Sequence, residues 1–340
     1  MRHWLPRLLI IASLGLHVIT AASYIRQPDL MAAFTVYPIW MWSLIGLILS
    51  ALAFLFWRAQ LSLMLVTLWL LTILTASDES HALANIGKEV PELGLPKPFQ
   101  SQETIRVCTL NWGALKLNSA EVRKQAAMIA AYKPDILFMQ EITPWHAEIM
   151  ADIVYPVRGD FRADGHSATL TKWQINDTTP NRMLHSHHTT LRLPKSRQYP
   201  DGRLIDCVNF HLKSAITDMR LWQASCWKRH AANRKLQRKQ VIWSLTLLQN
   251  STPFPTRPVV VAGDLNAPAS DPIHDLLRGH FTDSFNKVGA GWANTWHRRI
   301  PFQRIDYIYT SPLLRPVRSR NVVIPASDHL MVVSDFILLP

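Results

Sequence analysis

The sequence predicts an α/β domain that follows a membrane-spanning region of about three helices. The first 98 or so of the 340 residues are largely apolar. Beyond them, short runs of β-branched residues alternate with helical patterns, as expected for a sheet covered by helices. Most of these strand-like runs end in a polar residue. We therefore expect a membrane region over residues 1–81, a proline-rich linker over 82–100 and an α/β domain over 101–340.

Three apolar stretches make up the predicted membrane region. The second, Val36 to Trp57, contains 22 residues without a charge. The other two, Leu8 to about Tyr24 and Leu61 to about Ser77, are near the short limit for a helix that crosses a bilayer. Three such stretches in succession argue against helices in a soluble core. We expect a multi-pass membrane protein whose partner is the lipid bilayer.

The basic residues that flank these stretches predict their orientation. Arg2 and Arg7 favour a cytoplasmic start, and Arg58 favours a cytoplasmic tip for the hairpin that follows. Three crossings then place residues 78–340 on the extracytoplasmic side, in the periplasm or outside the cell. The alternative is a signal peptide cleaved near Thr20-Ala21-Ala22. The two remaining crossings would still leave the large domain on that side.

The positive charge lies almost wholly outside the membrane region. Residues 1–98 hold 6 of the 36 Lys and Arg and 5 of the 24 Asp and Glu, which leaves 30 basic and 19 acidic residues in 99–340. About +11 of the formal net charge of +12 therefore belongs to the second part. This excess suits an anionic partner such as nucleic acid, phospholipid headgroups or phosphate esters. A basic surface that only keeps the protein soluble is the alternative.

The cysteines and the histidine cluster do not indicate a metal site. Three cysteines, without a CxxC spacing, form neither a disulfide framework nor a zinc motif. We interpret Cys108 and Cys207 as small buried residues, and a bridge between two of the three stays open. The histidines at 185, 187 and 188 have no second ligand group at zinc spacing.

The run from Val259 to Pro268 is the central motif of the domain. Three valines predict a buried strand, and Gly263 allows the backbone to turn. Asp264 and Asn266 follow two positions apart, on the same side of the strand end. Read alone, Gly-Asp-X-Asn is also an ordinary turn.

Other predicted strands end in residues of the same chemical kinds. Taken singly, Glu141 could begin a helix, His211 could be a core histidine and Asp306 could pair with Arg304. Their common place at strand ends indicates one shared site instead. The candidate residues are Asn111, Glu141, His211, Asp264, Asn266, Asp306, Asp328 and His329.

At these positions the sequence resembles the endonuclease/exonuclease/phosphatase superfamily of divalent-metal phosphodiesterases. The resemblance runs from Arg106 to the C-terminus, with six motifs in the family's order. It implies a four-layer α/β/β/α sandwich of two mixed sheets with the site at one end. The motifs are Leu110-Asn111-Trp112-Gly113, Pro134 to Glu141, Val208 to Leu212, Gly263 to Asn266, Arg304 to Ile308 and Ser327-Asp328-His329.

The resemblance also implies a role for each site residue. Glu141, Asn111 and Asp328 would hold Mg²⁺, with Mn²⁺ as the alternative ion. Asp264 would position or deprotonate the attacking water, and Asn266 would hold a phosphoryl oxygen. His329, oriented by Asp306, would act on the phosphate or as general base. His211 would contact the phosphate or protonate the leaving group.

The predicted activity is hydrolysis of a phosphodiester in nucleic acid or in a phospholipid headgroup. The two histidines resemble those of secreted deoxyribonucleases and bacterial sphingomyelinases. Thr143 stands where abasic-site nucleases have a lysine, which argues against abasic-site repair. A basic helix from Thr217 to Gln249 contains Trp222, Trp227 and Trp243. It suits headgroups or a nucleic-acid backbone, unless its tryptophans face the sheet.

Two other functions stay open at this point. A phosphomonoesterase would use every one of the same residues. A non-catalytic module that binds phosphate ligands on a membrane anchor is the reading from a different class. The complete residue set argues against such a module, and no obligate protein partner is evident.

Overall fold

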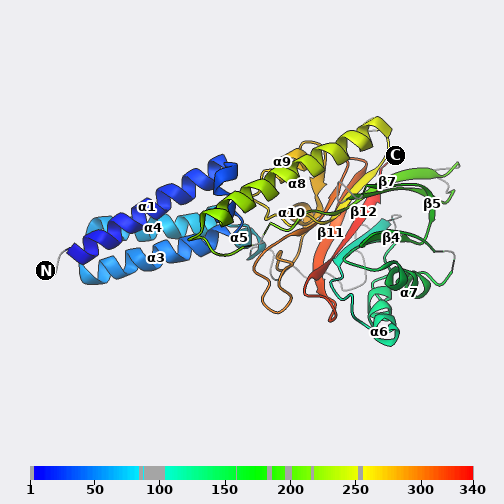
Figure 1. The fold of residues 1–340 in the computed structure, drawn as a ribbon, viewed down its shortest axis with the longest axis horizontal. Helices are drawn as coiled ribbons and strands as arrows, with labels where there is room; N and C mark the ends of the chain where they lie inside the picture. Colours follow the sequence, from blue (N-terminus) through cyan, green and yellow to red (C-terminus); the bar gives the residue numbers. More distant parts are fainter. Residues whose placement is uncertain are drawn as a thin grey trace. The chain divides into compact units, whose positions relative to one another are not determined.

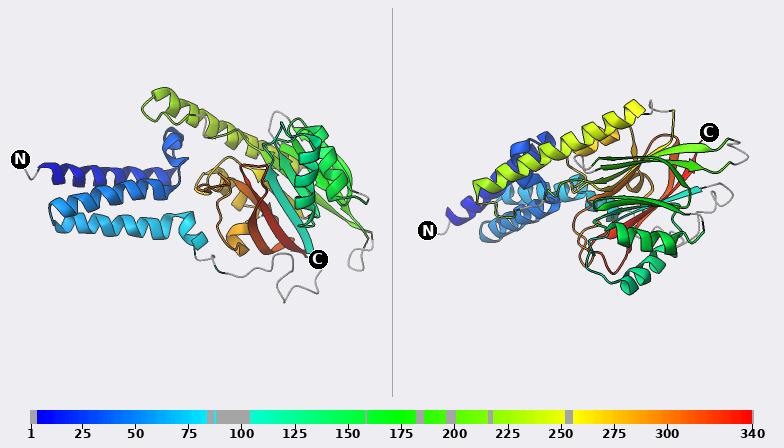
Figure 2. Two further views of the ribbon diagram at one scale, coloured as in Figure 1. Left: turned by 90° about the horizontal axis from the view of Figure 1, so that it is seen from below. Right: turned by 45° about the vertical axis from the view of Figure 1, so that its right-hand side comes forward.

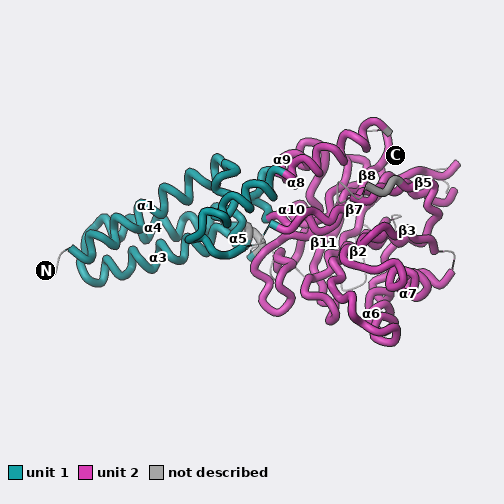
Figure 3. The backbone as a smooth tube through the Cα atoms, viewed as in Figure 1, with its two compact units in different colours: residues 1–84, 215–235, 268–272 teal, residues 85–214, 236–267, 273–340 magenta. Residues whose placement is uncertain are grey.

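The computed structural model describes residues 4–83, 87, 104–157, 159–181, 186–195, 201–215, 218–251 and 256–339. These form two compact units (Figure 3). Unit 1 comprises residues 1–84, 215–235 and 268–272, and unit 2 comprises 85–214, 236–267 and 273–340. Nearly all of the predicted linker over 82–100 lies outside the described residues.

The N-terminal part of unit 1 is a set of apolar helices. Two of them, α1 and α3, are long and apolar enough to cross a membrane. The third predicted span is the 17-residue helix α4, so the count of about three reduces to two by this measure. The helices are α1 (Trp4–Arg26), η1 (Asp29–Met31), α2 (Ala32–Thr35), α3 (Ile39–Phe56), α4 (Gln60–Ala76) and α5 (Asp78–Leu83).

Small and polar residues hold α1, α3 and α4 together. The Ser13 hydroxyl donates to the Gly46 carbonyl at 3.1 Å and lies 2.7 Å from that of Ser50. The Trp69 indole N–H donates to Ser13 Oγ at 2.9 Å. A Cβ on Gly46 would lie 2.0 Å from this indole ring, so only glycine allows the approach.

Unit 2 is a sandwich of two mixed six-stranded sheets (Figures 1 and 2). The first sheet has the order β11-β12-β1-β2-β4-β3, and the second has β5-β6-β7-β8-β10-β9. The strands are β1 (Thr104–Asn111), β2 (Ile136–Gln140), β3 (Asp160–Asp164), β4 (Ser167–Thr171), β5 (Gln174–Asn181), β6 (Ser186–Leu193), β7 (Arg203–His211), β8 (Val259–Asp264), β9 (Thr282–Asp283), β10 (Asp306–Thr310), β11 (Leu314–Val323) and β12 (Leu330–Leu338).

Helices cover the outer faces of the sheets, which confirms the predicted α/β/β/α sandwich. On the first sheet, α6 and α7 pack on Cys108 and Leu110, while Val107 faces the second sheet. This alternation is the period-2 pattern of a strand buried on both faces. The helices are α6 (Ser119–Ala130), α7 (Pro144–Val154), α8 (Ala224–Ser251), α9 (Ile273–Arg278) and α10 (Ser284–Val288).

Several elements differ from the prediction. Helix α7 was not predicted, although Thr143 caps it by accepting from the His146 N–H at 3.2 Å and a proline follows. Strands β3, β5 and β9 were also missed. The basic helix begins at Ala224, seven residues later than expected. The three cysteines are free and buried, as single core residues would be.

A buried ionic network ties β1, β11 and β12 together. Asp335 is 1% exposed and accepts from Arg106 Nε at 2.7 Å and from Arg318 Nε at 2.8 Å. We expect Asp335→Ala to lower the free energy of unfolding by about 3–5 kcal/mol, because two guanidinium groups lose their carboxylate. Thermal unfolding in detergent measures this, and Asp275→Ala, at an exposed side chain, is the control. Equal melting temperatures for the two variants would contradict the prediction.

Candidate active site

Strand pairing brings the predicted site residues to one end of the sandwich. Asn111 pairs with Gln140 across the parallel β1 and β2, and Glu141 follows directly. In the other sheet, Asp264 pairs with both His211 and Asp306. Beneath the site, the buried side chains of Gln140 and Asn209 join the two sheets by a 2.6 Å hydrogen bond. The site therefore lies where both sheets end in polar residues.

Glu141 lies at the centre of the first group of contacts. Asn111 Nδ2 donates to its Oε1 at 3.1 Å, and His211 Nε2 lies 3.4 Å from the same oxygen. The hydrogen bond from His211 lowers the pKa of Glu141 to about 2. Glu141 also has a φ of +49°, which is unusual for a residue other than glycine. It is thus an ionised carboxylate on a strained turn.

Asp264 accepts hydrogen bonds at both of its oxygens. Its Oδ2 accepts from Asn111 Nδ2 at 2.9 Å and from Asn266 Nδ2 at 3.1 Å, and its Oδ1 accepts from the Asn266 N–H at 2.8 Å. Burial raises its pKa, and the neighbouring Asp306 raises it further. The second amide hydrogen of Asn266 goes to the Leu212 carbonyl at 3.0 Å. Asn266 therefore orients Asp264, and its predicted contact with phosphate stays a prediction.

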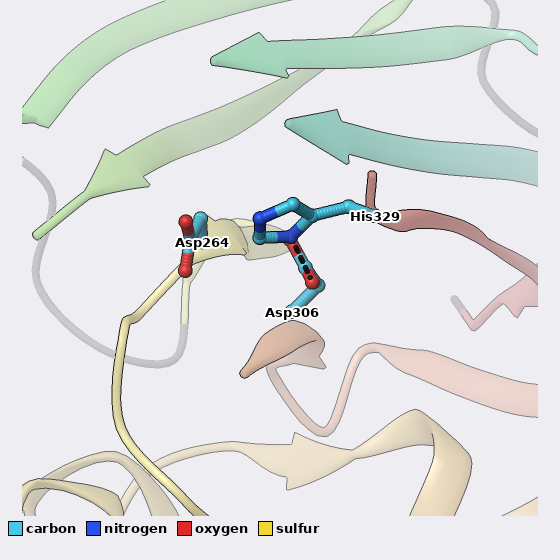
Figure 4. A group of neighbouring side chains, drawn as sticks. All are labelled: Asp264, Asp306 and His329. Atoms are coloured by element: carbon cyan, nitrogen blue, oxygen red, sulfur yellow. Dashed lines mark hydrogen bonds and ion pairs between the residues drawn. The ribbon is translucent and has the colours of Figure 1, made fainter. Parts of the chain in front are cut away.

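His329 forms a close group with two buried carboxylates. Its Nδ1 lies 2.8 Å from Asp306 Oδ2 (Figure 4). Burial alone would lower its pKa, but Asp306, Asp264 and Asp328 raise the pKa well above the ordinary value. One potential ligand atom each from Asp264, Asp306 and His329 lie within 4.8 Å of one another. Among the described residues this is the single group of His, Cys, Asp and Glu that meets that test for a metal.

The three predicted metal ligands surround a different point, next to Gly113. A Cβ built on Gly113 would lie 3.3 Å from Asp328 Oδ1, 3.9 Å from Asn111 Oδ1 and 4.0 Å from Glu141 Oε2. The Asn111 Oδ1 atom is buried and accepts no hydrogen bond from the described residues. These oxygens form a cradle of the hard ligands that Mg²⁺ prefers. The residues present thus fit a small divalent cation.

Two further residues position the site and were not predicted. The Ser327 hydroxyl donates to the Asn111 carbonyl at 2.6 Å and accepts from the His329 N–H at 2.9 Å. Thr295 Oγ1 accepts from the Asp306 N–H at 3.2 Å. Ser327 stood within a quoted motif, whereas Thr295 had no signal because it lies in an irregular loop. Both link the strand that bears a site residue to a neighbouring segment.

Two residues of the predicted histidine cluster, His187 and His188, lie on strand β6 and are at least partly buried. His187 Nε2 lies 3.0 Å from Thr178 Oγ1, and burial lowers the pKa of His187 and His188 to about 4. The residue at 185 lies outside the described residues.

The family model described as the Endonuclease/Exonuclease/phosphatase family matches residues 113–329 of this chain. The chain belongs to this family. The match starts two residues after Asn111, which the strand pairing nonetheless brings to the site. The family comprises hydrolases, among them nucleases and phosphatases, and is generally dependent on a divalent metal. No curated protein matches the chain.

Solved structures support the fold of this family member. The catalytic domain of human Nocturnin with bound sulfate has 19% identity and a TM-score of 0.50, covering 72% of this chain and 99% of that one. TDP2 of D. rerio in complex with a single-strand DNA product has 16% identity and a TM-score of 0.51, covering 69% of this chain and 99% of that one. A mannosyl-6-phosphatase from Bacteroides thetaiotaomicron has 15% identity and a TM-score of 0.50, covering 69% of this chain and 100% of that one. At such identities the likeness concerns the fold alone.

Proposed function

We propose that the protein is a membrane-anchored, Mg²⁺-dependent phosphodiesterase. The observation that carries this proposal is the convergence of two groups at one end of the sandwich. Three oxygens surround the point next to Gly113, and Asp264, Asp306 and His329 lie close together. Asn111 joins the two groups, since its amide donates to both Glu141 and Asp264. Such a site can hold a cation and a water beside one phosphate.

We assign the cation to the cradle of Asn111, Glu141 and Asp328. In the other group, His329 Nδ1 is engaged by Asp306 Oδ2 at 2.8 Å, so that nitrogen is not available as a ligand. Asn111 Oδ1, buried and without a hydrogen bond from the described residues, is an acceptor that a cation would satisfy. When bound, the metal would neutralise charge on the phosphate and the developing alkoxide.

The other residues supply the proton transfers and hold the phosphate. Asp264, fixed by Asn111 and Asn266, would position or deprotonate the attacking water. The raised pKa of His329, held by Asp306, favours its protonated form, which would donate a hydrogen bond to a phosphoryl oxygen rather than act as general base. His211, 24% exposed and next to Glu141, would contact the phosphate or protonate the leaving group. For Asn266 to donate to a phosphoryl oxygen, as predicted, its amide would have to release either Asp264 or the Leu212 carbonyl.

The membrane location rests on the N-terminal helices. α1 and α3 are apolar and long enough to span a bilayer. We propose that they and the shorter apolar helix α4 make three crossings and anchor a catalytic domain of residues 101–340. The basic flanks Arg2, Arg7 and Arg58 favour an extracytoplasmic side for that domain. The excess of basic residues there suits a nucleic acid or a phospholipid as substrate.

A phosphomonoesterase is the second candidate. One structure of similar fold is described as a mannosyl-6-phosphatase, and the same site residues would serve a monoester. The full-length protein in detergent should be tested on bis-p-nitrophenyl phosphate and on p-nitrophenyl phosphate. Preference for the first substrate supports the phosphodiesterase, and preference for the second favours the alternative. Plasmid DNA and sphingomyelin vesicles then separate the two classes of diester.

Removal of the metal should abolish hydrolysis. We expect EDTA to lower the rate on bis-p-nitrophenyl phosphate at least about 100-fold, because the charge on the diester is then left uncompensated. Excess Mg²⁺ or Mn²⁺ should restore the rate. Zn²⁺ in equal amount is the control for a non-specific divalent effect. An unchanged rate in EDTA would contradict the metal requirement.

Gly113→Ala should weaken metal binding without unfolding the protein. Its φ is +59°, so a methyl group there costs about 1–2 kcal/mol of stability and enters the cradle. Gly165→Ala is the matched control, because its φ is +60° and no atom lies within 4 Å of the added Cβ. We expect equal losses in melting temperature, with a Kd for Mn²⁺ raised about tenfold only in Gly113→Ala. Equal Mn²⁺ affinity in the two variants would contradict the cradle.

A further inference from the structure

Two segments that are distant from the N-terminus belong to unit 1 together with the apolar helices. They are residues 215–235, which include the first half of α8, and residues 268–272 (Figure 3). A buried ion pair joins them, because Arg234 Nε lies 2.9 Å from Asp271 Oδ2 and both side chains are about 5% exposed. Arg234 also donates to Thr35 Oγ1 at 2.6 Å. The first half of α8 is therefore fixed to the connection between α1 and α3.

The connection between α1 and α3 indicates where one surface of the bilayer would lie. α1 ends at Arg26 and α3 begins at Ile39, so the chain reverses over residues 27–38. If α1 and α3 cross a membrane, residues 27–38 lie at one of its surfaces. Trp42, whose indole N–H donates to the Phe34 carbonyl at 3.1 Å, is an aromatic residue suited to that surface. Arg234, which donates to Thr35, lies at the same level.

Large apolar side chains of this segment are exposed. Trp222 is 80% exposed and Met219 is 65% exposed, whereas Cys226 and His230 are buried and contact the Asp218 carbonyl. The prediction left open whether the tryptophans face the sheet. Trp222 does not, and Trp243 further along α8 is 61% exposed. Two large apolar side chains three residues apart are thus exposed together, and exposed apolar patches are found at contact surfaces.

The charges around these side chains are mainly positive. Residues 215–235 contain five Lys and Arg and one Asp. That acid, Asp218, is buried and accepts from Arg220 at 2.9 and 3.0 Å, which closes the turn before α8. Lys228 and Arg229 are exposed on the first turns of the helix. Indole and thioether groups amid cations are the composition of a surface that enters lipid headgroups.

We propose that Met219 and Trp222, flanked by Arg220, Lys228 and Arg229, form a second membrane contact that inserts into an anionic bilayer surface. This contact, the interfacial turn, comprises residues 218–229 and rests on the proposed membrane anchoring. It lies at the level of the connection between α1 and α3, because Tyr37 of that connection interacts electrostatically with Asp218 and Cys226. The bilayer rather than a protein is its occupant, because the turn belongs to the same compact unit as the candidate spans.

Spin labels on the full-length protein test this contact. Met219→Cys and Trp222→Cys place a nitroxide on the interfacial turn, in vesicles of phosphatidylcholine with 30% or so phosphatidylglycerol. Ile48→Cys, on the exposed side of α3, reports whether the anchor inserts. Met128→Cys, an exposed methionine on α6, is the matched control. Labelling of the unaltered chain checks that the three buried native cysteines do not react.

We expect the labels at 219 and 222 to collide with oxygen more often than with a water-soluble nickel complex, and the label at 128 to do the reverse. The depth should increase with the share of phosphatidylglycerol. The label at 48 could lie in lipid while the labels at 219 and 222 are as accessible to the nickel complex as the label at 128. In that case the proposed membrane contact of the interfacial turn is wrong and the membrane anchor stands. If the label at 48 is in water, the anchor itself is wrong. Labels at 219 and 222 that are immobile and shielded from both agents would indicate a protein contact and overturn the assignment to lipid.

Discussion

Replacement of Glu141 by glutamine is expected to lower kcat/KM for bis-p-nitrophenyl phosphate about 1000-fold. The side chain is ionised at neutral pH, because its pKa lies at about 2. Glutamine keeps the size but removes the negative charge that would hold the cation. In Glu141, Oε1 contacts Asn111 and His211 and Oε2 faces the cradle. A glutamine has only one oxygen, so it cannot replace both of these acceptors.

Two measurements separate the metal from the fold in this variant. The affinity for Mn²⁺, followed by the signal of the free ion in electron paramagnetic resonance, should fall together with the rate. Glu148→Gln is the matched control, since Glu148 lies exposed on α7 and outside the site. If Glu141→Gln binds Mn²⁺ as tightly as the unaltered protein, the cation does not occupy the cradle. The buried group of Asp264, Asp306 and His329 would then be the better candidate.

His329 and Asp306 should behave as one unit. We expect His329→Ala and Asp306→Asn each to lower kcat by about 100- to 10,000-fold, since a positioned histidine contributes on that scale. The 2.8 Å bond between Nδ1 and Oδ2 fixes the ring, and an amide at 306 would no longer stabilise its protonated form. The kcat of the double variant should therefore be only slightly lower than that of the less active single variant.

The comparison of the double variant with the singles decides between cooperation and independent roles. Losses that multiply would mean that Asp306 acts without His329. His280→Ala, at a partly exposed ring outside the site, controls for removal of a histidine. Circular dichroism melts are needed for each variant, because Asp306 is fully buried and its loss can also weaken β10.

The sequence predicts the strands that carry the site because their residues are apolar on both faces. Val259 to Val261 are fully buried, and a run of β-branched residues has few other interpretations. The polar residue after such a run is then placed at a sheet end by geometry alone. Asn111, His211, Asp264 and Asp306 all stand at the end or start of such a strand.

Other features depend on contacts that no local pattern contains. Strand β5 includes Asp177 and Pro180, so its sequence does not resemble a strand, and pairing with β6 forms it. Ser327 bonds to Asn111, which is 216 residues away, and a serine in a loop carries no sign of this. The orientation of Trp243 was likewise beyond prediction, because residues buried on α8 include polar ones such as Gln237. The usual apolar stripe that tells the inner face of a helix from the outer one is thus weak there.

The segments that unit 1 takes from the second half of the chain bear on how the protein is divided. A fragment that begins near residue 100 would lack Thr35, which accepts a hydrogen bond from Arg234. The buried ion pair between Arg234 and Asp271 would then lose its neighbours from the N-terminal helices. An isolated fragment would then expose a surface built to be covered, and aggregation of that fragment would say little about the site. Unit 1 is therefore built from three separate stretches of the chain, and the full-length polypeptide is the form in which to produce the protein.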